Sequence, residues 1–137
     1  MFKLVDYEKY IKDKNVDKVV IIKYGNFYRC VNNDALITSY LLNYKITKRD
    51  TVGFPINTLN KVLEALKDNK ISCVVIYGIN NVISYCIIVN KYMEILDKAI
   101  KYDNIINAIK IINDLSYEIL SKDIRKSHDI FVFLRNL

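Results

Sequence analysis

Residues 24–30 are Tyr24-Gly25-Asn26-Phe27-Tyr28-Arg29-Cys30. This stretch and the residues on either side of it decide the predicted fold. The run before them, Val19-Val20-Ile21-Ile22, is continuously β-branched, which suits a strand buried on both faces. Gly25-Asn26 is a tight-turn pair, and the residues after it have strand composition. We therefore predict a β-hairpin from Tyr24 to Val31. Because side chains alternate along a strand, Phe27 and Tyr28 should point to opposite faces, and Tyr28 is assigned to the core.

Helical signals flank this hairpin. Apolar residues at three- and four-residue spacing predict a short helix from Asp6 to about Lys14, with Asp6 as its N-cap. Asn32-Asn33-Asp34 is a helix-start signal, and helical spacing continues to about Asn43. One helix is thus expected before the buried strand and another directly after the hairpin.

The next part of the chain contains its single proline, Pro55. Proline denies the preceding residue a helical conformation, so Gly53-Phe54-Pro55 is expected to be a fixed loop. Thr58 is expected to cap the helix that follows. Two β-rich runs, residues 71–77 and 82–89, then predict a second hairpin.

After Asn90 the apolar residues keep helical spacing to Leu120, with a break expected near Asp103-Asn104. The apolar run at residues 130–134 is expected to be buried against the domain or a partner. The predicted fold class is α/β (α+β). A small mixed β-sheet flanked by helices is assigned to residues 1–90, and a helical extension packed on the same domain to residues 91–137.

Composition and charge narrow the classes of function. The chain has 137 residues, 52% of them hydrophobic and 26% charged, which is typical of a globular domain. Its net charge is +6, and residues 18–49 contain six basic residues and one acidic residue, so this segment carries most of the excess. Such a concentration fits a DNA-binding face, and it fits a solvated lysine-rich surface about as well.

The sequence argues against an enzyme. Three cysteines without a CxxC pair suggest neither a zinc site nor a disulfide framework, and no paired carboxylates are visible. Ser127-His128-Asp129 is contiguous, whereas the members of a catalytic triad converge from separate segments. No metal or cofactor is expected. The N-terminus lacks signal-peptide architecture and no apolar run is long enough to span a membrane, so a cytoplasmic protein without membrane contact is expected.

Several short motifs in a fixed order resemble the N-terminal mismatch-recognition domain (domain I) of the DNA mismatch-repair protein MutS. That family reads Gly-x-Phe-Tyr-Glu, Asp-Ala, Leu-Thr-Lys-Arg and Gly-Val-Pro. This chain has Gly25-Asn26-Phe27-Tyr28-Arg29, Asp34-Ala35, Ile46-Thr47-Lys48-Arg49 and Gly53-Phe54-Pro55. The likeness extends from about Asp6 to Val89, and the chain is expected to be a stand-alone version of this domain.

The resemblance implies a way of binding DNA. In the family, the Phe of the Phe-x-Glu motif is a wedge that enters kinked DNA from the minor groove and stacks on a mispaired base, and the Glu hydrogen-bonds that base. Carried over, Phe27 is the wedge. Arg29 stands at the Glu position, and a guanidinium only donates hydrogen bonds, so it is expected to favour DNA generally through minor-groove acceptors. Lys23, Lys48 and Arg49 are the expected basic contacts.

Other functions remain open at this point. The family acts through an ATPase, but this chain has no Gly-x-x-x-x-Gly-Lys-Ser/Thr loop and should not hydrolyse nucleotide by that mechanism. The rival hypothesis is a protein-interaction module that keeps the fold without the DNA wedge. A nucleic-acid-processing enzyme is a weaker third. The C-terminal helices could serve a homodimer or another protein partner.

Overall fold

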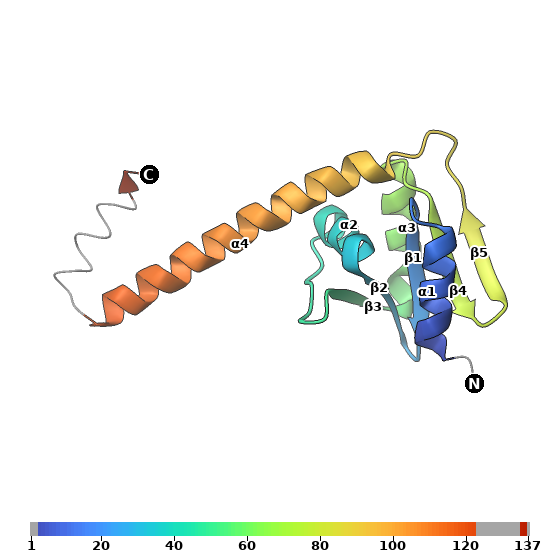
Figure 1. Cartoon of the computed structure of the whole chain (residues 1–137), viewed down its shortest axis with the longest axis horizontal. Helices are drawn as coiled ribbons and strands as arrows, with labels where there is room; N and C mark the ends of the chain where they lie inside the picture. Colours follow the sequence, from blue (N-terminus) through green and yellow to red (C-terminus); the bar gives the residue numbers. More distant parts are fainter. Residues whose placement is uncertain (1–2, 123–134, 137) are drawn as a thin grey trace. The chain divides into compact units, whose positions relative to one another are not determined.

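The computed structural model describes residues 3–122 and 135–136, with the backbone alone for residues 120–122. It confirms the predicted class, a mixed five-stranded sheet with helices followed by a long C-terminal helix (Figure 1). The elements are α1 (Leu4–Lys14), β1 (Val19–Tyr24), β2 (Phe27–Val31), α2 (Asn32–Leu42), β3 (Thr51–Pro55), the 3-10 turn η1 (Ile56–Thr58), α3 (Leu59–Asp68), β4 (Cys73–Gly78), β5 (Asn81–Tyr85) and α4 (Tyr92–Lys122).

The sheet has the strand order β3-β2-β1-β4-β5, so the apolar strand β1 lies at its centre. β1 runs parallel to β4, and the other neighbouring strands are antiparallel. Val19 and Ile21 pack in the cluster that includes residues of α2, α3 and α4, whereas Val20 and Ile22 pack with Tyr7 of α1. Burial of β1 on both faces is therefore confirmed, and helices cover both sides of the sheet.

Three local predictions are wrong in whole or in part. Gly53-Phe54-Pro55 lies in strand β3 and not in a loop, which an edge strand permits because Pro55 stands at its end. Thr58 stands at the N-cap position of α3 as predicted, but its side chain makes no capping bond; its hydroxyl donates to the carbonyl oxygen of Pro55 at 2.7 Å. Asp6 lies in the first turn of α1, which begins at Leu4 after Lys3.

Helix α4 is continuous through Asp103-Asn104, so the expected break is absent. Residues 1–100 form one compact unit, and residues 101–137 form a second. The start of α4 belongs to the first unit, where Tyr92, Leu96 and Ala99 are buried in the core. In the second unit, the apolar side chains of Ile105, Ile106, Ile109, Ile111, Ile112 and Leu115 are exposed. The apolar run at residues 130–134 lies outside the described residues.

Candidate nucleic-acid interface

The β1–β2 hairpin exposes one aromatic side chain and buries the next. Its turn needs a positive φ, and Gly25 supplies it at +56° without steric cost. Phe27, the first residue of β2, is 54% exposed, while Tyr28 is 5% exposed. The Tyr28 ring stacks on that of Phe54 with centroids 6.0 Å apart and meets the edge of Tyr77. The alternation predicted from the sequence is thus present.

Two apolar residues at the same end of the sheet as Phe27 were missed by the sequence reasoning. Ile56 follows β3, and its backbone N–H donates to the Asn26 carbonyl oxygen at 3.2 Å, which places it beside the hairpin turn. Ile79 lies in the β4–β5 turn, at the same end of the sheet, because β1 and β4 are parallel and in register. Both side chains are exposed. We call Phe27, Ile56 and Ile79 the hairpin end; Figure 1 shows the β1–β2 and β4–β5 turns at this end. The sequence signal for Ile79 was an apolar residue between two predicted strands; Ile56 had none, because residues 53–55 were expected to be a loop.

Arg29 lies two residues after Phe27 on the same face of β2 and is held by the protein itself. Its Nη2 donates to Glu8 Oε1 at 2.8 Å and to the Tyr24 hydroxyl at 3.0 Å. Its guanidinium carbon lies 4.0 Å from the centre of the Tyr24 ring. The side chain of Arg29 is 28% exposed and that of Glu8 is 8% exposed. Much of the Arg29 charge is therefore offset by Glu8, a partner that the sequence reasoning did not identify.

This ion pair leaves hydrogen-bonding capacity unused. Among the described residues, buried Glu8 Oε2 and Arg29 Nε have no hydrogen-bond partner. Burial raises the pKa of the Tyr24 hydroxyl, against the lowering effect of the Arg29 charge. Tyr24 therefore stays a neutral phenol that can accept from Arg29 and donate elsewhere. The ion pair beside Phe27 is thus incompletely hydrogen-bonded within the described residues.

The three lysine and arginine residues predicted to touch DNA are not gathered at one place. Lys23 is exposed and pairs with Tyr28, so its side chain leaves the sheet on the face opposite to that of Phe27. Lys48 and Arg49 are exposed in the loop before β3. β3 begins beside Val31 and ends beside Phe27. Four residues at about 3.3 Å each put that loop roughly 13 Å from Phe27 along the strand.

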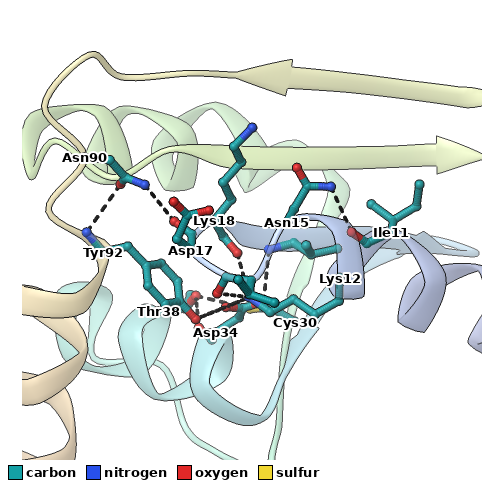
Figure 2. Close-up of polar contacts among 12 residues, drawn as sticks. Ile11, Lys12, Asn15, Asp17, Lys18, Cys30, Asp34, Thr38, Asn90 and Tyr92 are labelled. Carbon is teal, nitrogen blue, oxygen red and sulfur yellow. Dashed lines mark hydrogen bonds and ion pairs between the residues drawn. The ribbon is translucent and has the colours of Figure 1, made fainter.

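A buried polar cluster fixes the elements that carry this surface (Figure 2). Asp34 is 2% exposed, and its Oδ1 accepts from Lys12 Nζ at 2.8 Å and from the Tyr92 hydroxyl at 2.7 Å. Its Oδ2 accepts from the Val20 backbone N–H at 3.0 Å. The cluster therefore joins α1, β1, α2 and the first residue of α4. Sequence reasoning treated Asp34 as a helix start and family motif, and it missed Tyr92.

Burial is the main cause of the pKa shifts in this cluster. Burial raises the pKa of the Asp34 carboxyl, and the charge of Lys12 and the hydrogen bonds from Lys12, Tyr92 and Val20 counteract it. Burial and the negative charge of Asp34 also raise the pKa of Tyr92, which remains a donor at any ordinary pH. The cluster is a structural joint rather than an acid–base pair, because every oxygen of the Asp34 side chain already has a partner within the protein.

Within residues 3–122 and 135–136, no cluster of three His, Cys, Asp or Glu side chains could hold a metal ion. A groove of about 450 Å³ lies at the opposite end of the sheet from Phe27 and has apolar walls that include Leu63, Ile71 and Ile87.

No helix in the described part is long and apolar enough to cross a membrane. Ser127-His128-Asp129 lies outside the described residues.

Comparison with known proteins adds to this geometry. The family model of MutS domain I matches residues 4–83. A curated protein, the DNA mismatch repair protein MutS of Fervidobacterium nodosum, is 38% identical over 61 residues. That alignment covers 42% of this chain and 7% of the relative, so the chain matches only a small part of the length of that protein.

Proposed function

The chain belongs to the MutS domain I family, and from this premise we propose that it is a DNA-binding module for mismatched, damaged or kinked duplexes. The hairpin end docks in the minor groove, and Phe27 inserts between base pairs. The observation that carries the proposal is the 54% exposure of Phe27 on a hairpin in the matched part of the chain. An exposed aromatic face can replace base stacking that is lost at a kinked or mispaired step.

The hairpin is suited to hold a wedge in place. Phe27 pairs with Tyr24 on one side and with Pro55 on the other. The bond from Ile56 to Asn26 adds a third tie at the turn. Tyr28, the next residue, is anchored in the core. The backbone of Phe27 therefore has little conformational freedom to lose on binding, which favours insertion over flexible contact.

Arg29 is proposed to act next to the wedge with only part of its donors. A guanidinium has five N–H donors, and the bonds to Glu8 and Tyr24 both come from Nη2. The donors on Nη1 remain for minor-groove acceptors such as adenine N3 or thymine O2, whereas Nε is buried. Since both base types offer such acceptors, this contact favours duplex DNA over a particular mispair.

The basic residues are proposed to touch the phosphate backbone away from the inserted step. Lys48 and Arg49 lie roughly 13 Å from Phe27 along the strand, which corresponds to about four base-pair steps of a duplex. Lys23 is closer but faces the other side of the sheet. These contacts would add salt-dependent affinity without reading sequence. The chain lacks a nucleotide-binding glycine loop, so binding proceeds without ATP hydrolysis.

The test is a binding titration of the full chain on matched, mismatched and single-stranded DNA. Measured by fluorescence anisotropy, wild-type protein should bind duplex DNA with little mismatch preference and should bind more weakly as salt rises from about 50 to about 200 mM. Phe27→Ala should weaken binding to duplex DNA by roughly 10- to 100-fold, because stacking on one base contributes about 1–3 kcal/mol.

Ile88→Ala is the matched control for this titration. Ile88 is also an exposed apolar side chain, but it follows Ile87, whose N–H bonds to Ser72 at the opposite end of the sheet. Its truncation should leave affinity unchanged. Equal losses in both variants, or no binding at low salt, would contradict the proposal. A large preference for mismatched DNA would show that Arg29 reads mispairs after all.

A protein-interaction module is the second candidate, and the apolar character of the hairpin end favours it. Ile56 and Ile79 are exposed at the same end of the sheet as Phe27, and Glu8 offsets the charge of Arg29. Such a patch with reduced charge also suits a protein partner. The exposed apolar residues of α4 after Ile100 support a further contact with a second copy of the chain or with a protein partner. Absence of DNA binding at low salt would favour this candidate.

A further inference from the structure

The second unit of the chain presents an apolar face with coiled-coil spacing. Taking Tyr102 as position a of a heptad, Ile109 and Ser116 are the next a positions, and the d positions are Ile105, Ile112 and Ile119. The three residues at the centre of this seam, Ile105, Ile109 and Ile112, are all exposed, as are Ile106 at position e and Leu115 at position g. Apolar side chains therefore extend to both sides of the a/d seam.

The charged residues of this segment occupy the other side of the helix. Asp103, Lys110, Asp114 and Glu118 fall at positions b, c and f, and from residue 102 to residue 119 no e or g position carries a charge. Charges at e and g normally set the choice of partner and its orientation. Because the e and g positions are uncharged, this apolar face is complementary to the same face of a second copy, with isoleucine packing against isoleucine.

From these positions we infer that residues 102–119 of α4 assemble three or four copies of this chain through their a, d, e and g side chains. Isoleucine at every d position disfavours a parallel two-stranded coiled coil and favours three or four strands. The apolar e and g positions point the same way, because in a larger bundle each helix contacts two neighbours. A helix that is apolar over most of its circumference is buried in an assembly rather than left in water.

The amount of surface is adequate for association. Full burial of one such side chain removes about 60–120 Å² of apolar surface, so Tyr102, Ile105, Ile106, Ile109, Ile112 and Leu115 together would bury roughly 360–720 Å² per chain. This approaches the roughly 800 Å² per partner of a standard specific interface. The inference does not depend on DNA binding by the first unit. If both hold, several hairpin ends would act on one duplex with increased avidity.

The experiment measures the mass of the full chain in solution without DNA, by light scattering and sedimentation from low to high micromolar concentration. We expect the mass of a trimer or tetramer at high concentration. Ile112→Asp should raise the apparent dissociation constant at least about tenfold, because it places a charge in the seam. Ile111→Asp is the matched control, since it makes the same change one residue away at position c.

Three results would overturn the inference. These are a wild-type chain that stays monomeric across the range, a mass of two chains that does not rise further, and equal effects of Ile111→Asp and Ile112→Asp. Circular dichroism of both variants at low concentration checks that each keeps the helix. If Ile112→Asp loses helix, Ile112→Ser, which removes the apolar side chain without adding a charge, is measured against Ile111→Ser under the same criteria.

Discussion

Helix α1 is joined to the rest of the first unit by two ion pairs one helical turn apart, and they differ in how completely they are satisfied. Lys12 binds Asp34, and both oxygens of that carboxylate accept hydrogen bonds within the protein. Glu8 binds Arg29, and in this pair buried Glu8 Oε2 and Arg29 Nε have no hydrogen-bond partner among the described residues.

The difference separates a fully satisfied structural joint from an ion pair with unused hydrogen-bonding atoms. A buried charge whose bonds are all made inside the protein stabilises one arrangement of the elements around it. Unused polar atoms beside an exposed aromatic residue are costly to the isolated protein, and they are acceptable where a ligand or water completes them. Lys12–Asp34 is of the first kind. Glu8–Arg29, next to Phe27, is of the second.

The largest effect should come from removing the acid of the satisfied pair. Asp34→Ala leaves Lys12, the Tyr92 hydroxyl and the Val20 N–H without their acceptor, and it should lower the free energy of unfolding by about 3–5 kcal/mol. Urea denaturation measures this. Asp13→Ala on the exposed side of α1 is the control and should change stability by less than about 0.5 kcal/mol. Similar losses of stability in the two variants would show that Asp34 does not stabilise the contact between these elements.

A smaller loss of stability is expected at the incomplete pair. Arg29→Ala leaves the carboxylate of Glu8 buried without its partner, but Arg29 is partly exposed and makes fewer bonds, so the cost should be about 2 kcal/mol. Adding Glu8→Gln should restore part of it, because the uncompensated charge is then gone. If Arg29→Ala costs as much as Asp34→Ala, the contrast between the two pairs fails.

Tyr92 tests one bond of the satisfied pair. Tyr92→Phe keeps the buried ring and removes the donor to Asp34, which should cost about 1 kcal/mol in the free energy of unfolding. The matched control is Tyr117→Phe, since Tyr117 is exposed. Thermal or urea unfolding compares them. No difference between the two would mean that Lys12 and Val20 alone satisfy the carboxylate.

The smallest effect should appear in the pH dependence of stability. Burial raises the pKa of Asp34 in the folded state, so the folded protein holds this proton more tightly than the unfolded chain. The resulting contribution is fully present below the unfolded pKa of about 4 and is lost as pH rises through the folded pKa. The stability of wild type relative to Asp34→Asn should therefore decline from acidic to neutral pH. An increase instead would mean that Lys12 outweighs burial.

Features that depend on neighbouring residues could be predicted from the sequence. The apolar run of β1, the Gly25-Asn26 turn and the alternation of Phe27 and Tyr28 are each encoded within a few residues. Order and spacing of the motifs then led to the family. These signals are local because turn conformation and strand alternation are set by the residues themselves.

Features that depend on distant partners could not be predicted. Pro55 was assigned to a loop because nothing in its own segment shows that it ends an edge strand. Glu8 meets Arg29 across 21 positions, and Tyr92 meets Asp34 across 58, so neither pairing has a local signature. The continuous α4 shows that Asp103-Asn104 alone does not end a helix that has apolar residues on both sides.

The position of Tyr92 also shows that the first compact unit extends beyond the residues that match the family. The family model ends at residue 83, yet Tyr92, Ile95, Leu96 and Ala99 fill the core of the first unit, and Asn90 prepares that turn by accepting from the Tyr92 N–H at 3.3 Å. A piece cut at the end of the recognisable family sequence would therefore expose its own interior. In this chain the compact first unit is longer than the part that matches the family, and it extends to about Ile100.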